Sequence, residues 1–222
     1  MYSAVTALGL LSLLLRLAAG SPTSPAAHTT KLVTFEDAPV STNPLSVLLP
    51  EVNPVGNYNG LSWSGFVFAG GQGPIVTGVI PHSGSHFAGY GLGSGAQGLF
   101  GAAVLTPLPP YKTFSMTSLY FGCVANTVVA VPGAVVGIPA PCQVAFIAYL
   151  PGDATPRYEV PESFGVMNSP TMKMTQAKFT GEQLAGVERV EIVVYDNGLP
   201  DGSVVAALSA LLVDDVAYTL NI

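Results

Sequence analysis

The chain has 222 residues, of which 49% are hydrophobic and only 9% are charged. A charged fraction so far below the usual value of about 25%, with 25 glycines and 19 prolines, is unsuited to a helical bundle and typical of short strands joined by turns. The formal net charge of −6 argues against nucleic acid and anionic membrane surfaces as partners.

Residues 1–20 have the pattern of a secretory signal peptide. An apolar run extends through Leu15, and the small residues Ala18 and Gly20 follow it. The run is shorter than the roughly 20 apolar residues of a membrane span, which makes a membrane anchor the weaker alternative. Cleavage after Gly20 removes Arg16 and changes the net charge from −6 to −7. We expect a secreted, extracellular monomer with no membrane insertion.

Residues 21–30 are rich in Ser, Thr and Pro, which predicts a flexible leader before a single domain at 31–222. Apolar segments with β-forming residues recur from there to the end. Many short strands between turns predict an all-β fold, an antiparallel β-sandwich of two sheets (a jelly roll). The segment 84–101 holds seven glycines and is interpreted as a loop or weak strands. Residues 43–60 are interpreted as a connection between strands. Residues 203–212 are a possible short helix. The predicted strands are 31–37, 61–69, 73–81, 113–125, 142–150, 157–164, 173–180, 187–196 and 207–220.

The chain has two cysteines, Cys123 and Cys142, and each lies at the end of an apolar strand-like run. In an oxidising compartment an isolated pair is most simply a disulfide. A bridge of this loop length would stabilise the fold by about 3 kcal/mol on the chain-entropy model.

Several short motifs occur in a consistent order: "VTFED", "YNGLSWSGF", "IPHSGSHFAGYG", "TFSMTSLYFG", "VERVEI" and "LLVDDVAYTL". In this respect residues 31–222 resemble a group of secreted β-sandwich proteins, many of them fungal, with the jelly roll of carbohydrate-binding modules and galactose-binding-like domains. The resemblance implies glycan binding. It also implies a structural calcium ion where the first and last strands meet.

Aromatic side chains are the candidate sugar-binding residues, because the C–H faces of sugars stack on aromatic rings. Tyr58 and Tyr90 lie in turn-rich segments and are expected to be exposed. Trp63 is a third candidate. It shares its alternation with Leu61 and Val67, which favours a packing role for its indole.

Catalytic motifs are missing from the sequence. There is no G-x-S-x-G, P-loop or dinucleotide fingerprint, and Glu188 and Glu191 are an odd number apart, which places them on opposite faces of a strand. His82 and His86 could share a metal on a helix, but Gly and Ser lie between them, so exposed loop histidines are favoured. An enzyme is therefore the weaker interpretation.

Acidic residues end the first predicted strand and interrupt the last one. Asp214 shares its register with Val216, Tyr218 and Leu220, so its carboxylate is expected in the core, where a partner is needed. The acidic motifs at both ends of the domain predict that the first and last strands are adjacent. Glu36 or Asp37 would then join Asp214 and, less favoured, Asp215 in a calcium site. The alternative is that Asp214 accepts hydrogen bonds from loop N–H groups.

Three functions remain open. The first is a secreted, non-enzymatic module that binds polysaccharide or glycoprotein glycans, or associates with cell walls. The second is an effector or elicitor acting on a host surface protein, and the third is a jelly-roll hydrolase or lyase.

Overall fold

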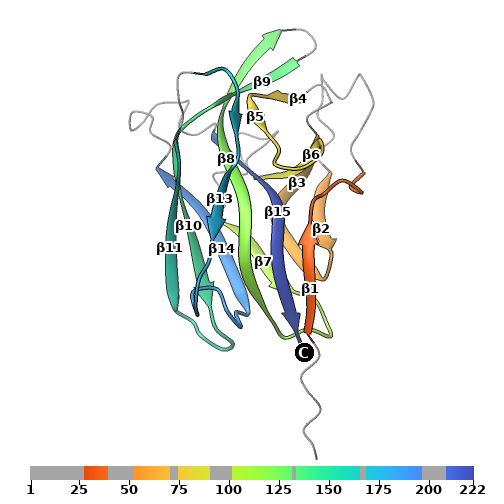
Figure 1. Ribbon diagram of the computed structural model, residues 1–222, viewed down its shortest axis with the longest axis vertical. Coiled ribbons are helices and arrows are strands. Elements are labelled where there is room, and N and C mark those ends of the chain that lie inside the picture. Colours follow the sequence, from red (N-terminus) through yellow and green to blue (C-terminus); the bar gives the residue numbers. More distant parts are fainter. Residues whose placement is uncertain are drawn as a thin grey trace, which may run out of the picture.

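The computed structural model describes residues 28–39, 53–70, 75–90, 102–131, 134–165, 169–196 and 209–222. Within these ranges the regular structure is entirely β (Figure 1), which confirms the all-β prediction. The predicted signal peptide lies outside the described residues. The strands are β1 (His28–Val33), β2 (Pro54–Tyr58), β3 (Leu61–Gly70), β4 (Ile75–Thr77), β5 (Val79–Ile80), β6 (His86–Tyr90), β7 (Ala103–Pro107), β8 (Thr113–Val131), β9 (Ala134–Pro139), β10 (Cys142–Tyr149), β11 (Tyr158–Phe164), β12 (Met172–Lys173), β13 (Thr175–Lys178), β14 (Arg189–Asp196) and β15 (Ser209–Asn221).

Thirteen of these strands form one continuous sheet in the order β11-β10-β14-β7-β3-β6-β15-β8-β9-β4, with β1 on β15, β13 on β8 and β2 on β3. All pairs in it are antiparallel except β4–β9, and β5 and β12 form a separate parallel pair. The sheet is strongly curled. Five strands separate β8 from β10 in this order, yet the two are joined by a disulfide.

That disulfide links Cys123 to Cys142, as predicted. The Cα atoms are 6.1 Å apart, within the normal range for a bridge. Both cysteines are buried, so the bridge crosses the core. It holds the two ends of the curled sheet together.

Gly65 lets β3 turn from one part of the sheet to the other. Residues 61–64 pair with β7, whereas residues 66–70 pair with β6, and β6 in turn pairs with β15. At Gly65 φ is +84°, and an added Cβ would lie 3.3 Å from the ring of Tyr90. A side chain would be strained in this left-handed conformation, which glycine adopts readily.

The first and last described strands are adjacent, as predicted. β1 pairs with β15 from His28–Asn221 to Val33–Val216, so the last three residues of the predicted leader belong to a strand. On its other edge β15 pairs with β8, and the register shifts by one residue between Asp214 and Ala217. This irregularity is a β-bulge, with Asp215 at a φ of +47°.

Alternation along the strands builds one hydrophobic core. In β10 the residues Val144, Phe146 and Ala148 are fully buried and belong to the core cluster. Phe121 of β8 packs edge-on against Phe146, with ring centroids 6.3 Å apart. Side chains from opposite ends of the strand order therefore meet inside the curl.

Some local predictions were incomplete. The glycine-rich segment 84–101 contains the strand β6, and the predicted connection 43–60 contains β2. β7 was not predicted. The candidate helix at 203–212 enters β15 at residue 209, and its earlier residues lie outside the described ranges.

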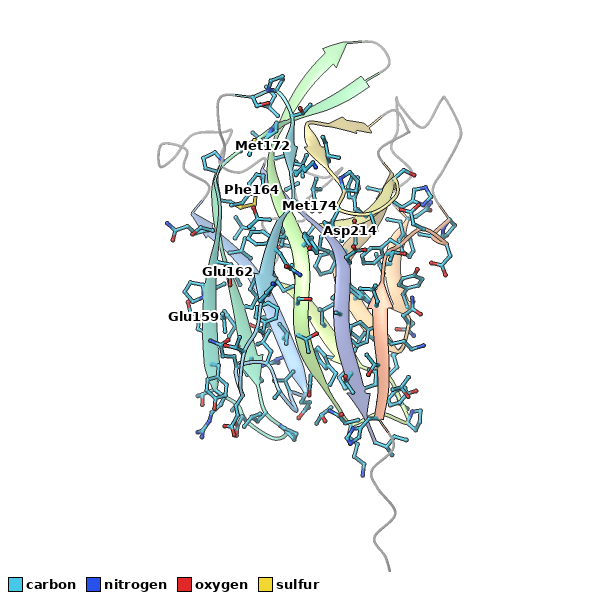
Figure 2. The ribbon with its side chains drawn as sticks, in the orientation of Figure 1. Glu159, Glu162, Phe164, Met172, Met174 and Asp214 are labelled. Atoms are coloured by element: carbon cyan, nitrogen blue, oxygen red, sulfur yellow. A yellow bond between two sulfur atoms is a disulfide. The ribbon has the colours of Figure 1, made fainter. Side chains whose placement is uncertain are left out.

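β11 lies at one end of the strand order and, among the described strands, pairs only with β10. It carries Pro161, which has no N–H to donate. Its neighbour Glu162 lies in the register of the buried residues Val160 and Phe164 (Figure 2). Burial raises the pKa of the Glu162 carboxyl. Among the described residues, this half-buried carboxylate has no hydrogen-bond partner.

Candidate functional site

Asp214 and Asp215 are both buried, with 0% and 9% of their surface exposed. In a regular strand they would point to opposite faces, but the bulge lets both carboxylates contact the same loop, residues 81–85. Asp214 Oδ2 accepts a hydrogen bond from Ser83 N at 2.8 Å. Asp215 Oδ1 accepts one from Ser83 Oγ at 2.6 Å, and its Oδ2 lies 2.6 Å from His82 Nδ1. Alternation along the strand favoured Asp214 as the core-facing aspartate. It could not predict that Asp215 contacts the same loop, because a bulge leaves no signal in an alternation pattern.

The protonation of Asp214 is perturbed by this position. Burial raises the pKa of its carboxyl to about 6, and the neighbouring Asp215 charge adds to the rise, while the hydrogen bond from Ser83 N opposes it. Asp214 also accepts a hydrogen bond from the Asp215 N–H at 2.8 Å. These backbone donors are the kind of partner that the hydrogen-bonding alternative predicted.

Glu36 holds the other end of the same loop. Its Oε1 accepts hydrogen bonds from Ser85 N and His86 N, each at 2.8 Å. Gly84 packs against the Glu36 carboxylate at a φ of +47°. Asp37 is directed elsewhere, because it accepts a hydrogen bond from the Tyr58 hydroxyl.

Three of the four predicted calcium ligands thus reach one loop: Asp214 and Asp215 from β15, and Glu36 from the segment after β1. Their oxygens accept protein hydrogen bonds. Within the described ranges, no group of three or more His, Cys, Asp and Glu residues is arranged to hold a metal ion. Calcium binding is not tested by these contacts and stays a prediction to be tested by titration.

His82 of this loop and His86, the first residue of β6, have separate partners. His82 faces Asp215, and its ring stacks on Tyr120 with centroids 3.4 Å apart. Its side chain is 45% exposed. His86 Nδ1 lies 3.1 Å from the backbone carbonyl of Glu36. His82 is therefore an exposed loop histidine, as expected, whereas His86 begins a strand and its side chain is only 26% exposed.

The predicted sugar-binding aromatics lie mostly inside the fold. Trp63 is 1% exposed, contacts Phe35 edge-on and donates its indole N–H to the Tyr58 carbonyl. A ring in this position packs the core, which is the role its alternation favoured. Tyr58 and Tyr90 are half-buried, and the ring of Tyr58 stacks on Phe35 with centroids 5.7 Å apart.

A row of polar and aliphatic side chains lies on the face of the sheet that points away from the core. Cross-strand pairing aligns one residue from each of five neighbouring strands, and most of the residues next to them along these strands are buried. Four inter-strand spacings of about 4.8 Å give this row a length of about 19 Å. The residues, in order across β11, β10, β14, β7 and β3, are Glu159, Ile147, Glu191, Val104 and Ser64. Figure 2 labels Glu159 at the β11 end of this row.

A compact trio stands at the centre of this surface, which we call the polar face. Arg189 pairs with Tyr149 across β14 and β10, and its guanidinium lies over the tyrosine ring, 3.8 Å from the centroid. Tyr149 donates its hydroxyl hydrogen to Glu191 Oε2 at 3.0 Å. Arg189 Nε lies 3.4 Å from Glu191 Oε1. Each side chain is thus held by the other two.

The polar face combines exposed and covered groups. The Arg189 and Glu191 side chains are 39% and 23% exposed, so their remaining donors and acceptors can reach a ligand. Tyr149 and Ala145 are buried although neither belongs to the core cluster. Neighbouring side chains on the polar face therefore cover Tyr149 and Ala145 and pack beneath the exposed groups.

Sequence reasoning missed the polar face. The odd spacing of Glu188 and Glu191 correctly separated them: Glu188 precedes β14 and accepts a hydrogen bond from Gly152 N at 2.9 Å. The alternation in "VERVEIVV" places Arg189 and Glu191 on one side of the strand. Their meeting with Tyr149 depends on the pairing of β14 with β10, which one strand alone does not specify.

Comparison with solved structures gives distant similarities. The crystal structure of a DUF4465 family protein from Bacteroides caccae aligns with a TM-score of 0.47 and 11% identity, over 86% of this chain and 98% of that one. The CBM22-2 xylan-binding domain from Paenibacillus barcinonensis Xyn10C aligns with a TM-score of 0.40 and 14% identity, with the same coverage. No family model matches the chain, and no curated protein matches it. Similarities this distant carry no argument about function.

Among the described residues, no helix is long and apolar enough to cross a membrane.

Proposed function

We propose that the chain is a secreted, non-enzymatic glycan-binding module that binds polysaccharide on the polar face. The observation that carries the proposal is the row from Glu159 to Ser64 with the Arg189–Tyr149–Glu191 trio beside it. In this proposal the curled sheet is a jelly roll of two layers, and the protein acts as a monomer. The disulfide is compatible with an extracellular location.

The chemistry of the row suits a sugar chain. Ionised carboxylates accept hydrogen bonds from hydroxyl groups, and a guanidinium donates to hydroxyl and ring oxygens. Half-buried aliphatic side chains such as Ile147 and Val104 can contact the C–H faces of sugar rings. Because the row crosses five strands, it can contact several sugar units of one chain.

The trio also supplies preorganisation. A ligand that orders flexible side chains must overcome their lost conformational freedom. Arg189 and Glu191 are already fixed by Tyr149 and by each other. Their hydrogen-bonding groups are therefore in place before a ligand arrives.

Binding to a panel of polysaccharides by pull-down and affinity electrophoresis tests the proposal. Arg189→Ala and Glu191→Gln should weaken binding about tenfold or more, because each removes a charged hydrogen-bonding group worth about 1.5–3 kcal/mol. Glu182→Gln, an exposed residue outside the polar face, serves as the control and should bind like the wild type.

Melting curves must show that the variants are folded. Equal glycan affinity of the wild type and both polar-face variants would place the binding surface elsewhere. Absence of binding to every polysaccharide tested would remove glycan recognition and leave the host-directed interaction protein as the next hypothesis.

A further inference from the structure

We infer that the polar face selects uncharged polysaccharides and rejects polyanionic ones such as polyuronates; this inference rests on the proposed function. It follows from the signs of the charges on the face and from the direction of the hydrogen bonds that they can make. Both are properties of the described strands.

The polar face has a small excess of negative charge, because two carboxylates share it with one guanidinium. Glu159 and Glu191 lie in the same row, two strands apart. Among the described outward-facing residues of β11, β10, β14, β7 and β3, Arg189 is the only cation. The full chain adds a net charge of −6. An anionic chain laid along the row therefore meets like charge at contact distance, within the Debye length of about 8 Å at physiological salt.

Arg189 offsets only part of this repulsion. Its guanidinium lies 3.8 Å from the centroid of the Tyr149 ring, and its Nε lies 3.4 Å from Glu191 Oε1. The Nε atom is buried and makes no hydrogen bond with the described residues. The guanidinium charge is thus largely balanced by Glu191, and the row stays negative through Glu159.

Hydrogen-bond direction leads to the same conclusion. Ionised carboxylates only accept hydrogen bonds, so Glu159 and Glu191 need a ligand that donates. Neutral sugars present hydroxyl donors along the whole chain. A uronate replaces a donor with a second acceptor, which would leave two facing acceptors without a proton between them.

Titration calorimetry with matched oligosaccharides tests the inference. The probes are neutral hexasaccharides of glucose, mannose and galactose, and an oligogalacturonate of the same length, at about 0.15 M salt. The wild type should bind at least one neutral probe, and the oligogalacturonate at least about tenfold more weakly. Higher salt should narrow that gap because it screens the repulsion.

A charge reversal sharpens the test. Glu159→Lys places a cation at the exposed end of the row, and we expect it to raise the affinity for oligogalacturonate several-fold. Glu182→Lys makes the same change of net charge away from the face and should not. If both variants gain the same affinity for oligogalacturonate, the effect is due to net charge alone and the inference is overturned.

The failure of this inference is distinct from that of the proposed function. Wild-type binding to oligogalacturonate as tight as to the neutral probes would refute the selectivity and leave glycan binding intact. If neither class of probe binds, the glycan-binding proposal falls, and the selectivity falls with it.

Discussion

Asp214 should make the protein more stable in mild acid than at neutral pH. Burial raises the pKa of this carboxyl from 3.8 to about 6, so the folded state holds a proton that the unfolded state releases. Stability gained from this proton nearly vanishes above about pH 7 and grows as the pH falls through 6 toward 3.8. By linkage, the free energy of unfolding rises by about 1.4 kcal/mol between pH 7.5 and pH 5.

Denaturant unfolding of the wild type and Asp214→Asn at a series of pH values measures this contribution. Asparagine keeps the size of the side chain but cannot accept hydrogen bonds from both Ser83 N and Asp215 N, so the variant should be less stable by about 1–3 kcal/mol at every pH. The proton on Asp214 is identified by how the stability difference between the two proteins changes with pH. The gap between the two proteins should widen by about 1.4 kcal/mol from pH 7.5 to pH 5.

Other groups titrate in the same range, but they are present in both proteins and cancel in the difference. Asp153→Asn, which removes an exposed carboxylate, is the control and should follow the wild-type profile. Parallel profiles for the wild type and Asp214→Asn would refute the reasoning, because they would show that Asp214 does not take up a proton on folding in this interval.

Three further predictions concern the scaffold. The double variant Cys123→Ala/Cys142→Ala should lose about 3 kcal/mol of unfolding free energy in chemical denaturation, since the bridge closes a loop with a sequence separation of 19; an unchanged midpoint would contradict this. Gly84→Ala should lower the melting temperature more than Gly152→Ala: both glycines have positive φ, but only at Gly84 does an added Cβ meet another residue, the Glu36 carboxylate. Equal losses would show that this contact is unimportant. For calcium, a melting temperature that rises over an EDTA-treated control and no longer does so in Asp214→Ala would support metal binding, and no rise would leave the aspartate with its hydrogen bonds alone.

Apolar segments between turn residues predicted much of the fold. The segments around Val144–Ala148 and Val190–Ile192 were identified as strands because they are short, apolar and rich in β-forming residues. β6 was less clear, because "HFAGY" lies in a glycine-rich segment. It is a strand because β3 and β15 pair with it on both edges. Strand formation of this kind depends on tertiary neighbours more than on local propensity.

The sites were harder to predict for two physical reasons. The bulge at Asp215 needs a left-handed backbone in a residue other than glycine, and the sequence carries no clear signal for that. The polar face needs cross-strand register, because Tyr149 and Arg189 are 40 residues apart in the sequence and meet only through β10–β14 pairing. The adjacency of β1 and β15, by contrast, was predicted from the acidic motifs at both ends of the domain.

The edge of β11, which no other described strand pairs with, bears on how the protein behaves when concentrated. An exposed strand edge is a template on which a second chain can add by backbone hydrogen bonding and begin aggregation. A strand aligned along β11 would find no N–H at Pro161 and would have to cover the half-buried carboxylate of Glu162. The same two residues that end the sheet on this side therefore protect the protein against fibril-like growth from that edge.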